Sequence, residues 1–347
     1  MSSCFARTSS PHPDAGDSDG LTEPEGFNVK FLDIKFWSHG TDKKVTWMKL
    51  ILVIKYYLMF LWTLSTYRPK YVLYNISWYK MPWPKDALFC ITSILLGRKL
   101  ILHDHGQYVN EFQSKIKSWI LNNATASIIL GNNVVDKYYG LMPISKLFVV
   151  PGAVSDMGQC NRWPKKTLNI LYLSYLSHDK GAEVAFDAMR SVLEQTNVTV
   201  TFAGPIENDC IALQLDKLQD DFPNRVNNLG YIENDWRKYR LFRNADIFIF
   251  PTIREAFGLV LLEAMSTGLP IVASSEGCIP EILPNGLLFK KGNVKEMVSQ
   301  VLLLIHSQQL RNELGNLNRN RYEENYTIDI YGKRMIKAFQ EMEKYGR

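Results

Sequence analysis

Cysteine is scarce in this sequence and is never clustered. Five cysteines are spread over 347 residues, and none forms a Cys-x-x-Cys pair. This spacing excludes a disulfide framework and a cysteine zinc site, so we expect a reducing, cytosolic compartment. The N-terminus also lacks the basic-then-apolar order of a signal peptide. We therefore interpret the four Asn-x-Ser/Thr sequons as chance matches: Asn75, Asn123, Asn197 and Asn325.

Long apolar runs and long basic runs are missing as well. The most apolar stretch, Lys49 to Leu64, is interrupted by Lys55. It is shorter than the roughly 18 residues that cross a bilayer, so it predicts a helix packed on a sheet. The net charge of +5 comes without the Lys/Arg run of a nucleic-acid arm, and no nucleic-acid partner is expected.

Basic and aromatic residues do gather in one stretch, between positions 43 and 70. This mixture suits an anionic membrane surface, and a solvated protein face is the alternative. The residues are Lys43, Lys44, Trp47, Lys49, Lys55, Tyr56, Tyr57, Trp62, Arg68 and Lys70.

The length predicts two domains, and no internal repeat or low-complexity core is present. Residues 1–26 are rich in Ser, Pro, Asp and Gly, which predicts a disordered tail or a degenerate first β-α unit. An N-terminal Rossmann-like domain is expected over 27–150, and a second over 151–330 that begins with an aperiodic linker at 151–168. Buried-strand patterns followed by helical patterns predict parallel sheets. The strand candidates lie at 71–76, 99–106, 127–131, 147–152, 168–174, 198–204, 245–251 and 270–274.

Ligands of open α/β sheets bind at the carboxyl ends of the strands. After the strand at 245–251, Gly258 is expected to open a helix whose first N–H groups can bind a phosphate. Glu255 precedes that helix and Glu263 lies within it. A wholly helical span of eight residues covers about 12 Å, so the two carboxylates cannot share one proton. We expect one to accept hydrogen bonds from a sugar and the other from a ribose.

The segment EAFGLVLLEAMSTGLPIV, with Glu255 and Glu263 at the ends of its first half, resembles the signature of family-4 retaining glycosyltransferases. An ordinary surface and core helix is the alternative. The resemblance extends from about Leu168 to Tyr326. It implies the α/β GT-B fold, with two Rossmann-like doubly wound parallel-sheet domains facing a cleft and the C-terminal segment 331–347 packing back on the first domain.

The resemblance also implies roles for individual residues. Glu255 would contact the transferred sugar and Glu263 the ribose, and Lys180 in the loop YLSYLSHDKG would neutralise the diphosphate. A solvated lysine at a helix start is the alternative for Lys180. Further donor contacts would come from Phe257, Gly258, Leu259, Ser174, Gly204, Pro205 and Tyr231. For the last three, which would line the base pocket, the alternatives are a common turn pair and a core aromatic residue.

In the first domain, KLILHDHGQY resembles the strand end where the family has a histidine facing the reacting sugar. This role falls on His105, with His103 as its competitor and a structural histidine as the alternative. His103 and His105 alternate as metal ligands do on a strand, but no second cluster completes a site, so no metal or other cofactor is expected.

Three features depart from the family pattern. The N-terminus has no Gly-rich loop after a strand, Tyr175 stands where an arginine is usual, and Pro151, Gly152 and Ala153 replace Pro-Asn-Gly. One phosphate-neutralising charge is therefore missing, which is expected to weaken donor binding.

The sequence therefore predicts a metal-independent, retaining hexosyltransferase-type enzyme. It would move a sugar from a nucleotide-diphosphate sugar to a hydroxyl of a glycan or lipid-linked acceptor. Cell-surface polysaccharide or lipopolysaccharide biosynthesis is the expected setting, with the protein cytoplasmic and peripheral on the inner face of the membrane. The alternative is a weak or inactive nucleotide-sugar-binding subunit that partners an active transferase. An epimerase would need a further acid/base pair that we do not find.

Overall fold

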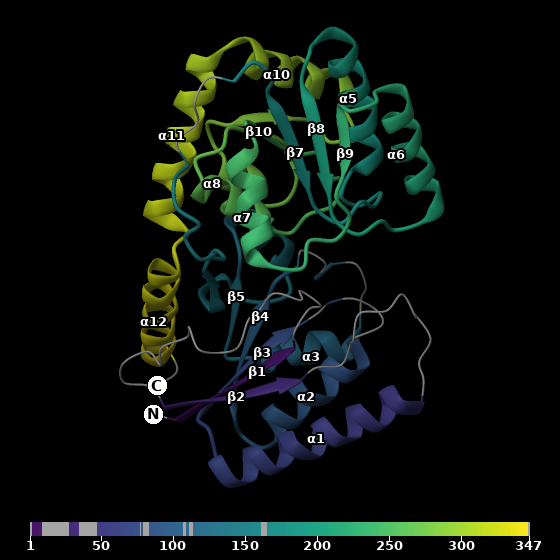
Figure 1. Ribbon diagram of the computed structural model, residues 1–347. Coiled ribbons are helices and arrows are strands. Elements are labelled where there is room, and N and C mark those ends of the chain that lie inside the picture. The colour runs from purple at the N-terminus through teal and green to yellow at the C-terminus, as the bar shows by residue number, and fades with distance from the viewer. Residues whose placement is uncertain are drawn as a thin grey trace. The chain divides into compact units, whose positions relative to one another are not determined.

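The computed structural model describes residues 2–8, 28–34, 47–76, 78, 83–106, 109–110, 114–160 and 165–345. The chain divides into two compact units, which are coloured along the chain in Figure 1. Unit 1 comprises Met1–Val150 together with Gly332–Arg347, and unit 2 comprises Pro151–Tyr331. Within the described part of the chain, no helix combines the length and the apolar character needed to cross a membrane.

Unit 1 is built on a six-stranded parallel sheet with the strand order β2-β1-β3-β4-β5-β6. Its central strands are buried apolar runs, as expected for a parallel sheet covered on both faces. The strands are β1 (Ser2–Thr8), β2 (Asn28–Ile34), β3 (Tyr71–Ile76), β4 (Lys99–Asp104), β5 (Ala126–Ile129) and β6 (Leu147–Val149).

Helices connect these strands and cover the sheet of unit 1. The longest is α1 (Trp47–Tyr67), which packs on α2 (Trp83–Leu95) through Phe60 and Phe89, whose ring centroids are 4.9 Å apart. The last turns of α12 (Ile328–Tyr345) pack on β3, where Phe339 lies edge-on to Tyr71 at 6.1 Å. The shorter helices are α3 (Lys115–Asn123), α4 (Asn132–Val135), η1 (Asp136–Tyr138) and η2 (Ile144–Lys146).

Of the two expectations for residues 1–26, the disordered tail is wrong for residues 2–8, and the degenerate first β-α unit stays the expectation for this segment. Residues 2–8 form β1, which pairs in parallel with β2 on one side and with β3 on the other. The sequence of these residues has only a weak strand pattern. The strand forms because pairing on both sides satisfies its backbone N–H and C=O groups. Residues 9–27, including most of the predicted tail, lie outside the described residues, as do Lys43 and Lys44 of the basic stretch.

Unit 2 is a second six-stranded parallel sheet, with the order β12-β11-β10-β7-β8-β9. The order reverses between β10, β7 and β8, which makes the unit doubly wound. Its strands are β7 (Asn169–Leu173), β8 (Thr199–Ala203), β9 (Val226–Asn228), β10 (Ile247–Phe250), β11 (Ile271–Ser274) and β12 (Leu287–Phe289).

Three helices of unit 2, α5 (Ala182–Gln195), α6 (Asp209–Asp221) and α10 (Val294–His306), bury apolar residues in the core of this unit. Phe186 of α5 packs edge-on against Phe202 of β8, with ring centroids 5.2 Å apart. Figure 1 shows α5 and α6 beside β8 and β9. The other helices are α7 (Asp235–Asn244), α8 (Leu259–Ser266), α9 (Ile279–Ile282) and α11 (Gln308–Asn325).

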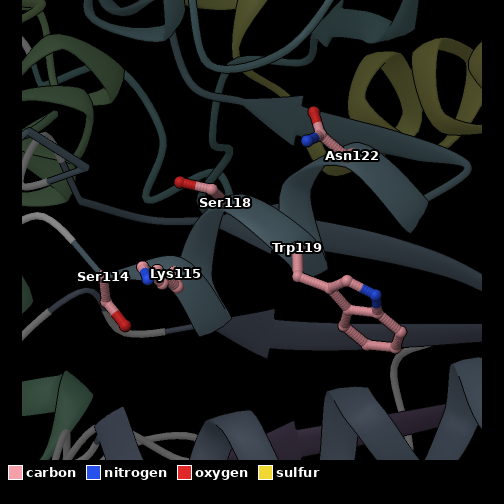
Figure 2. A pocket seen from close by; sticks show the side chains of 5 residues that line it. All are labelled: Ser114, Lys115, Ser118, Trp119 and Asn122. Carbon is pink, nitrogen blue, oxygen red and sulfur yellow. The ribbon is translucent and has the colours of Figure 1, made fainter.

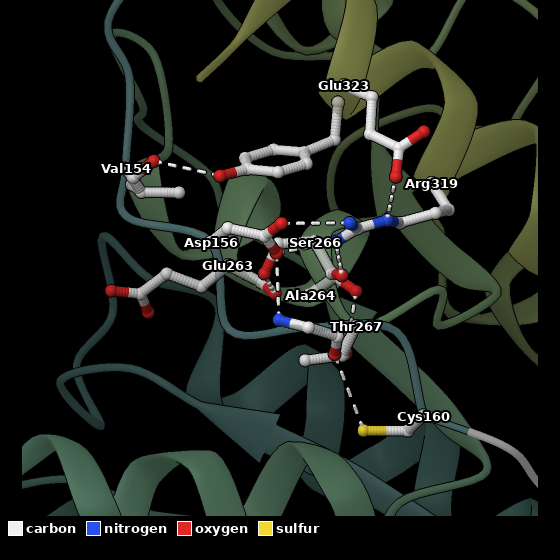
Figure 3. Close-up of polar contacts among 11 residues, drawn as sticks. Val154, Asp156, Cys160, Glu263, Ala264, Ser266, Thr267, Arg319 and Glu323 are labelled. Atoms are coloured by element: carbon white, nitrogen blue, oxygen red, sulfur yellow. Dashed lines mark hydrogen bonds and ion pairs between the residues drawn. The ribbon is translucent and has the colours of Figure 1, made fainter. Parts of the chain in front are cut away.

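The aperiodic segment predicted as a linker is tied to unit 2 where the structure describes it. Figure 3 shows Asp156 facing the guanidinium of Arg319 on α11, with Nη1–Oδ1 and Nη2–Oδ2 distances of 2.5 and 2.8 Å. Arg319 holds the pKa of the Asp156 carboxyl below its usual value. Tyr322 adds a hydrogen bond from its hydroxyl to the Val154 carbonyl, 3.0 Å away. Residues around 154–156 therefore belong to the packed body of unit 2.

Candidate functional site

The loops that follow β7, β8 and β9 meet at the carboxyl edge of the sheet in unit 2. The Gly204 N–H donates to the Gly230 carbonyl at 2.7 Å, and the Leu176 N–H donates to the Pro205 carbonyl at 2.8 Å. Ser174 is half-buried at the end of β7, and its N–H donates to Ala203 at 3.1 Å. Three of the predicted donor-binding residues, Ser174, Gly204 and Pro205, therefore lie together in hydrogen-bonded loops at the carboxyl edge of this sheet.

Two glycines allow these loops to approach one another closely. Gly204 has φ +143°, and a Cβ atom there would lie 1.9 Å from the Ser174 carbonyl oxygen. Gly181 has φ +70°, and a Cβ atom there would lie 1.9 Å from the carbonyl oxygen of Pro251. Only glycine fits both positions, because a side chain would meet backbone that cannot move aside.

The loop before α5 is fixed against the loop after β10. The Asp179 carbonyl accepts hydrogen bonds from the N–H groups of Ile253 and Arg254, both at 3.0 Å. The hydroxyl of the buried Tyr172 on β7 lies 3.0 Å from the Lys180 carbonyl oxygen and 3.2 Å from the Tyr175 carbonyl oxygen. Burial raises the pKa of Tyr172, so the hydroxyl keeps its proton and can donate a hydrogen bond to either carbonyl.

These contacts bring together Lys180, which is predicted to bind the diphosphate, and Glu255, which is predicted to bind the sugar. Lys180 Nζ lies 2.7 Å from Glu255 Oε2, and the two side chains are 30% and 12% exposed. The backbone of Glu255 is held on its other side by Gly277, where a Cβ atom would lie 2.1 Å from the Glu255 carbonyl oxygen. The Cys278 N–H donates to the Ala256 carbonyl at 3.1 Å. Both members of the pair are therefore set on a fixed backbone.

Helix α8 begins directly after this loop, as predicted. Gly258 is its N-cap and has φ +86°, and Leu259 is the first helical residue and is exposed. Phe257 is buried instead, against the Tyr326 ring at 6.3 Å and close to Gly152. The Phe257 side chain therefore serves packing, and only its backbone remains a candidate for donor contact. The first N–H groups of α8 supply the positive end of a helix dipole near Lys180 and Glu255.

The second predicted carboxylate is also paired with a lysine. Glu263 Oε1 lies 3.0 Å from Lys238 Nζ, which lies 3.6 Å from Asp235 Oδ1. In Figure 3 the Glu263 side chain points away from the Asp156–Arg319 pair. Lys238 was not among the residues predicted from the sequence. Its position in the first turn of α7 could have indicated it, because that helix starts at the same edge of the sheet. Asn234 caps the helix there through its side chain.

Tyr231 follows Gly230 and is exposed. A core position, which was its alternative, is therefore wrong. Its role in a base pocket stays a prediction, as do those of Gly204 and Pro205. Position 175 is a tyrosine and not an arginine, so it supplies no positive charge to this loop. Lys180 is the cation of the loop, and it is paired with Glu255.

His105, the residue predicted to face the sugar, lies in unit 1 just after β4 and is exposed. Its ring centroid is 4.1 Å from that of His103. His103 itself is buried, with Nδ1 3.1 Å from Asn75 Oδ1, and burial together with His105 lowers the pKa of its imidazole. His103 is therefore a neutral structural residue, and His105 is the better candidate. Its part in a reaction stays a prediction.

Asp104, between the two histidines, is a buried carboxylate that shapes this loop. Oδ2 accepts hydrogen bonds from Tyr138 Oη at 2.7 Å and Trp78 Nε1 at 3.0 Å, and Oδ1 accepts one from the Gly106 N–H at 2.8 Å. Burial raises the pKa of Asp104 to about 6. The bond to Gly106 fixes the backbone on both sides of His105.

Two further features of the described residues lie apart from these groups. A pocket of unit 1 is lined by α3 and its N-cap, through the residues labelled in Figure 2: Ser114, Lys115, Ser118, Trp119 and Asn122. It contains none of the predicted site residues. Among the residues that the structure describes, no group of three or more His, Cys, Asp and Glu side chains is placed to hold a metal ion.

Comparison with known proteins identifies relatives of unit 2. Residues 155–321 match the family model described as glycosyl transferases group 1. An uncharacterized glycosyltransferase of Methanocaldococcus jannaschii is 29% identical over 188 residues, which are 51% of this chain and 46% of that protein. The sulfoquinovosyl transferase of Arabidopsis thaliana is 31% identical, over 41% of this chain and 28% of that protein. The capsular polysaccharide biosynthesis glycosyltransferase CapM of Staphylococcus aureus is 25% identical, over 46% of this chain and 42% of that protein. The chain spans less than half the length of these curated relatives that it matches.

Solved structures resemble the whole chain at lower identity. Sucrose-phosphate synthase from Thermosynechococcus elongatus has a TM-score of 0.77 at 15% identity, over 99% of this chain and 100% of that one. HepE of Anabaena in complex with UDP and glucose has a TM-score of 0.72 at 17% identity, over 98% of this chain and 99% of that one. The fold prediction is therefore confirmed. This chain has the GT-B fold of glycosyltransferases, and the match to the glycosyl transferases group 1 model lies within its unit 2.

Proposed function

We propose that this protein is a retaining glycosyltransferase of family 4, which binds a nucleotide-diphosphate sugar in unit 2. One observation carries the proposal: Lys180 and Glu255 are paired at 2.7 Å beside the first turn of α8. A cation and a helix N-terminus together suit a diphosphate, and a neighbouring carboxylate suits sugar hydroxyls. HepE, which has a similar fold, was solved with UDP and glucose, which supports a donor of this class.

The pairing suggests how donor binding proceeds. The diphosphate would compete with Glu255 for Lys180, since both are anions that the ammonium group can bind. Glu255 would then be released to accept hydrogen bonds from the transferred hexose, and Glu263 from the ribose. As the bond to the anomeric carbon breaks, Lys180 and the N–H groups of α8 would stabilise the charge on the leaving phosphate. These groups supply the electrostatic stabilisation in our proposal, which includes no metal ion or other cofactor.

We further propose that the acceptor is a hydroxyl of a glycan or a lipid-linked glycan at the cytoplasmic face of the membrane, in polysaccharide or lipopolysaccharide biosynthesis. The name of one relative, a capsular polysaccharide biosynthesis glycosyltransferase, supports polysaccharide biosynthesis as this setting. The basic and aromatic stretch from position 43 to 70 supports contact with an anionic surface.

The donor can be found by thermal unfolding against a panel of nucleotide-diphosphate sugars, because a ligand that binds only the folded state raises the unfolding temperature. Transfer and hydrolysis of that donor are then measured for the wild type and for Glu255→Ala. We expect the wild type to turn the donor over and Glu255→Ala to lose at least about 100-fold in rate. Equal rates in both proteins would overturn the enzymatic proposal. Donor binding without turnover would favour the second candidate, a binding subunit, which the missing arginine at Tyr175 supports.

A further inference from the structure

Helix α1 of unit 1 exposes an apolar face that a helix packed on a protein normally buries. Five large apolar side chains recur at helical spacing: Ile51, Ile54, Leu58, Met59 and Trp62 are 63, 52, 59, 40 and 63% exposed. Positions three and four apart share one face of a helix. These residues therefore form one continuous stripe, which we call the α1 stripe, and Lys55 is an exposed residue beside it.

The opposite face of α1 already holds the helix to the rest of unit 1. Phe60 and Leu64 are fully buried, and the Tyr57 hydroxyl lies 2.8 Å from Thr92 Oγ1 on α2. Figure 1 shows α1 lying along the edge of unit 1, beyond α2. The usual amphipathic pattern, with a polar outer face, is thus missing, because both the packed face and the outer face are apolar.

Two large apolar side chains of the neighbouring helix α2 are exposed as well. Leu88 and Leu95 lie four residues before and three residues after Thr92, so they share its side of α2, and both are exposed. Thr92 in turn contacts α1 through Tyr57. Contiguous exposed apolar surface of this kind marks an interaction site in a soluble domain.

The charges around the α1 stripe favour one kind of partner. Between Asp42 and Asp86 the sequence has no Asp or Glu, and Asp86 itself is buried. In the sequence, the same interval contains Lys43, Lys44, Lys49, Lys55, Arg68 and Lys80. It also contains Lys70 and Lys85, which are paired with Glu343 and Asp86. A second copy of the chain would bring like charges together, whereas anionic lipid headgroups would neutralise them.

We infer that α1 is a membrane-binding helix that lies in the plane of an anionic bilayer, with the α1 stripe inserted among the lipids. No helix among the described residues can cross a membrane, so α1 is assigned to the interface. The inference rests on the proposed membrane setting of the acceptor and names the surface that makes the contact. Apolar insertion and attraction of Lys and Arg to headgroups act together in such binding.

Co-sedimentation of the full chain with vesicles tests this assignment. We expect binding to phosphatidylcholine vesicles that contain phosphatidylglycerol, and at least about tenfold weaker binding to phosphatidylcholine alone. The variant Ile54→Ser with Leu58→Ser should bind the anionic vesicles at least about tenfold more weakly than the wild type. Its matched control is Leu213→Ser on α6 of unit 2, whose side chain is as exposed, at 69%, and which should bind like the wild type.

Lys55→Glu gives a second, independent test, since it leaves the apolar area intact but places a negative charge beside the α1 stripe. It should also weaken binding to anionic vesicles. Unchanged binding in both variants would overturn the inference, as would a monomer–dimer equilibrium that the Ile54→Ser and Leu58→Ser changes abolish without affecting vesicle binding. Thermal unfolding with the donor separates this outcome from failure of the proposed function, because donor binding in unit 2 should be the same in every variant.

Discussion

Lys180 Nζ and Glu255 Oε2 lie 2.7 Å apart, so the cation predicted to hold the donor diphosphate is already bound to the carboxylate predicted to hold the sugar. Removing either partner leaves the other charge partly buried and without this ion pair, but the two changes should affect donor binding in opposite directions.

Glu255→Gln should free Lys180 for the diphosphate. We expect the nucleoside diphosphate of the chosen donor to bind as tightly as to the wild type or more tightly, while sugar transfer falls at least about 100-fold. Lys180→Met should weaken binding of the same nucleoside diphosphate about 10- to 100-fold, because one charge-assisted hydrogen bond is lost. Isothermal titration calorimetry measures both. Weaker binding to Glu255→Gln than to Lys180→Met would contradict the proposed competition.

Lys238→Met tests the second ion pair. Glu263, 3.0 Å from Lys238, would lose the cation that holds its carboxylate in place. We expect binding of the ribonucleoside diphosphate to weaken several-fold and its preference over the 2′-deoxyribonucleoside diphosphate to shrink, since an ill-positioned carboxylate reads the ribose less well. Lys295→Met, on an exposed face of α10, is the control and should retain both properties. An unchanged ribose preference in Lys238→Met would assign Lys238 a purely structural role.

Gly181→Ala should destabilise unit 2 and weaken donor binding together. A Cβ atom at position 181 would lie 1.9 Å from the Pro251 carbonyl oxygen, so the Lys180 loop would have to move. We expect a loss of about 2–4 kcal/mol in the free energy of unfolding. Gly292→Ala is a matched control, because Gly292 has a similar φ of +74° but no atom within 4 Å of an added Cβ. Its loss should be about 1 kcal/mol, from backbone strain alone. Equal losses in both variants, measured by urea unfolding, would refute the close-approach argument.

Asp104→Asn should change how stability depends on pH. Burial raises the pKa of Asp104 from its ordinary value to about 6 in the folded protein. The folded state therefore binds the proton more tightly than the unfolded state, so the contribution of Asp104 to stability is fully present below pH 4 and is lost as pH rises to 6 and above. The expected loss is about 3 kcal/mol, from roughly two pKa units.

The measurement is the free energy of unfolding of wild type and variant between pH 4 and 7. The difference between the two proteins should shift in favour of the variant as pH rises, since asparagine does not titrate. A difference between wild type and Asp104→Asn that stays constant over this range would contradict the raised pKa.

The sequence predicted strands well where apolar residues run together. The strand expected at 71–76 is β3, and the other seven candidates coincide with β4 to β8, β10 and β11. β1 was missed because its stability comes from pairing with β2 and β3, which no local pattern records. The short strands β9 and β12 were missed as well; β9 is a valine followed by two asparagines, which is no apolar run.

The candidate site was predictable only in part for a similar reason. The spacing of Glu255 and Glu263, with the glycine between them, located the loop and the start of α8. The partners of those carboxylates come from elsewhere in the chain, and Lys238, 25 residues before Glu263, had no signal in the motif. Tertiary pairing of this kind depends on which strand ends share an edge of the sheet, which the motif alone does not specify.

Unit 1 contains both the early residues of the chain and its last helical turns, with all of unit 2 between them. A ribosome makes the chain from the N-terminus, so residues 151–331 are synthesised and can fold before Phe339 exists to cover Tyr71. The unit that begins first is therefore completed last. During synthesis Tyr71 on β3 lacks its contact with Phe339 until position 339 has left the ribosome, so unit 1 should complete its folding after unit 2.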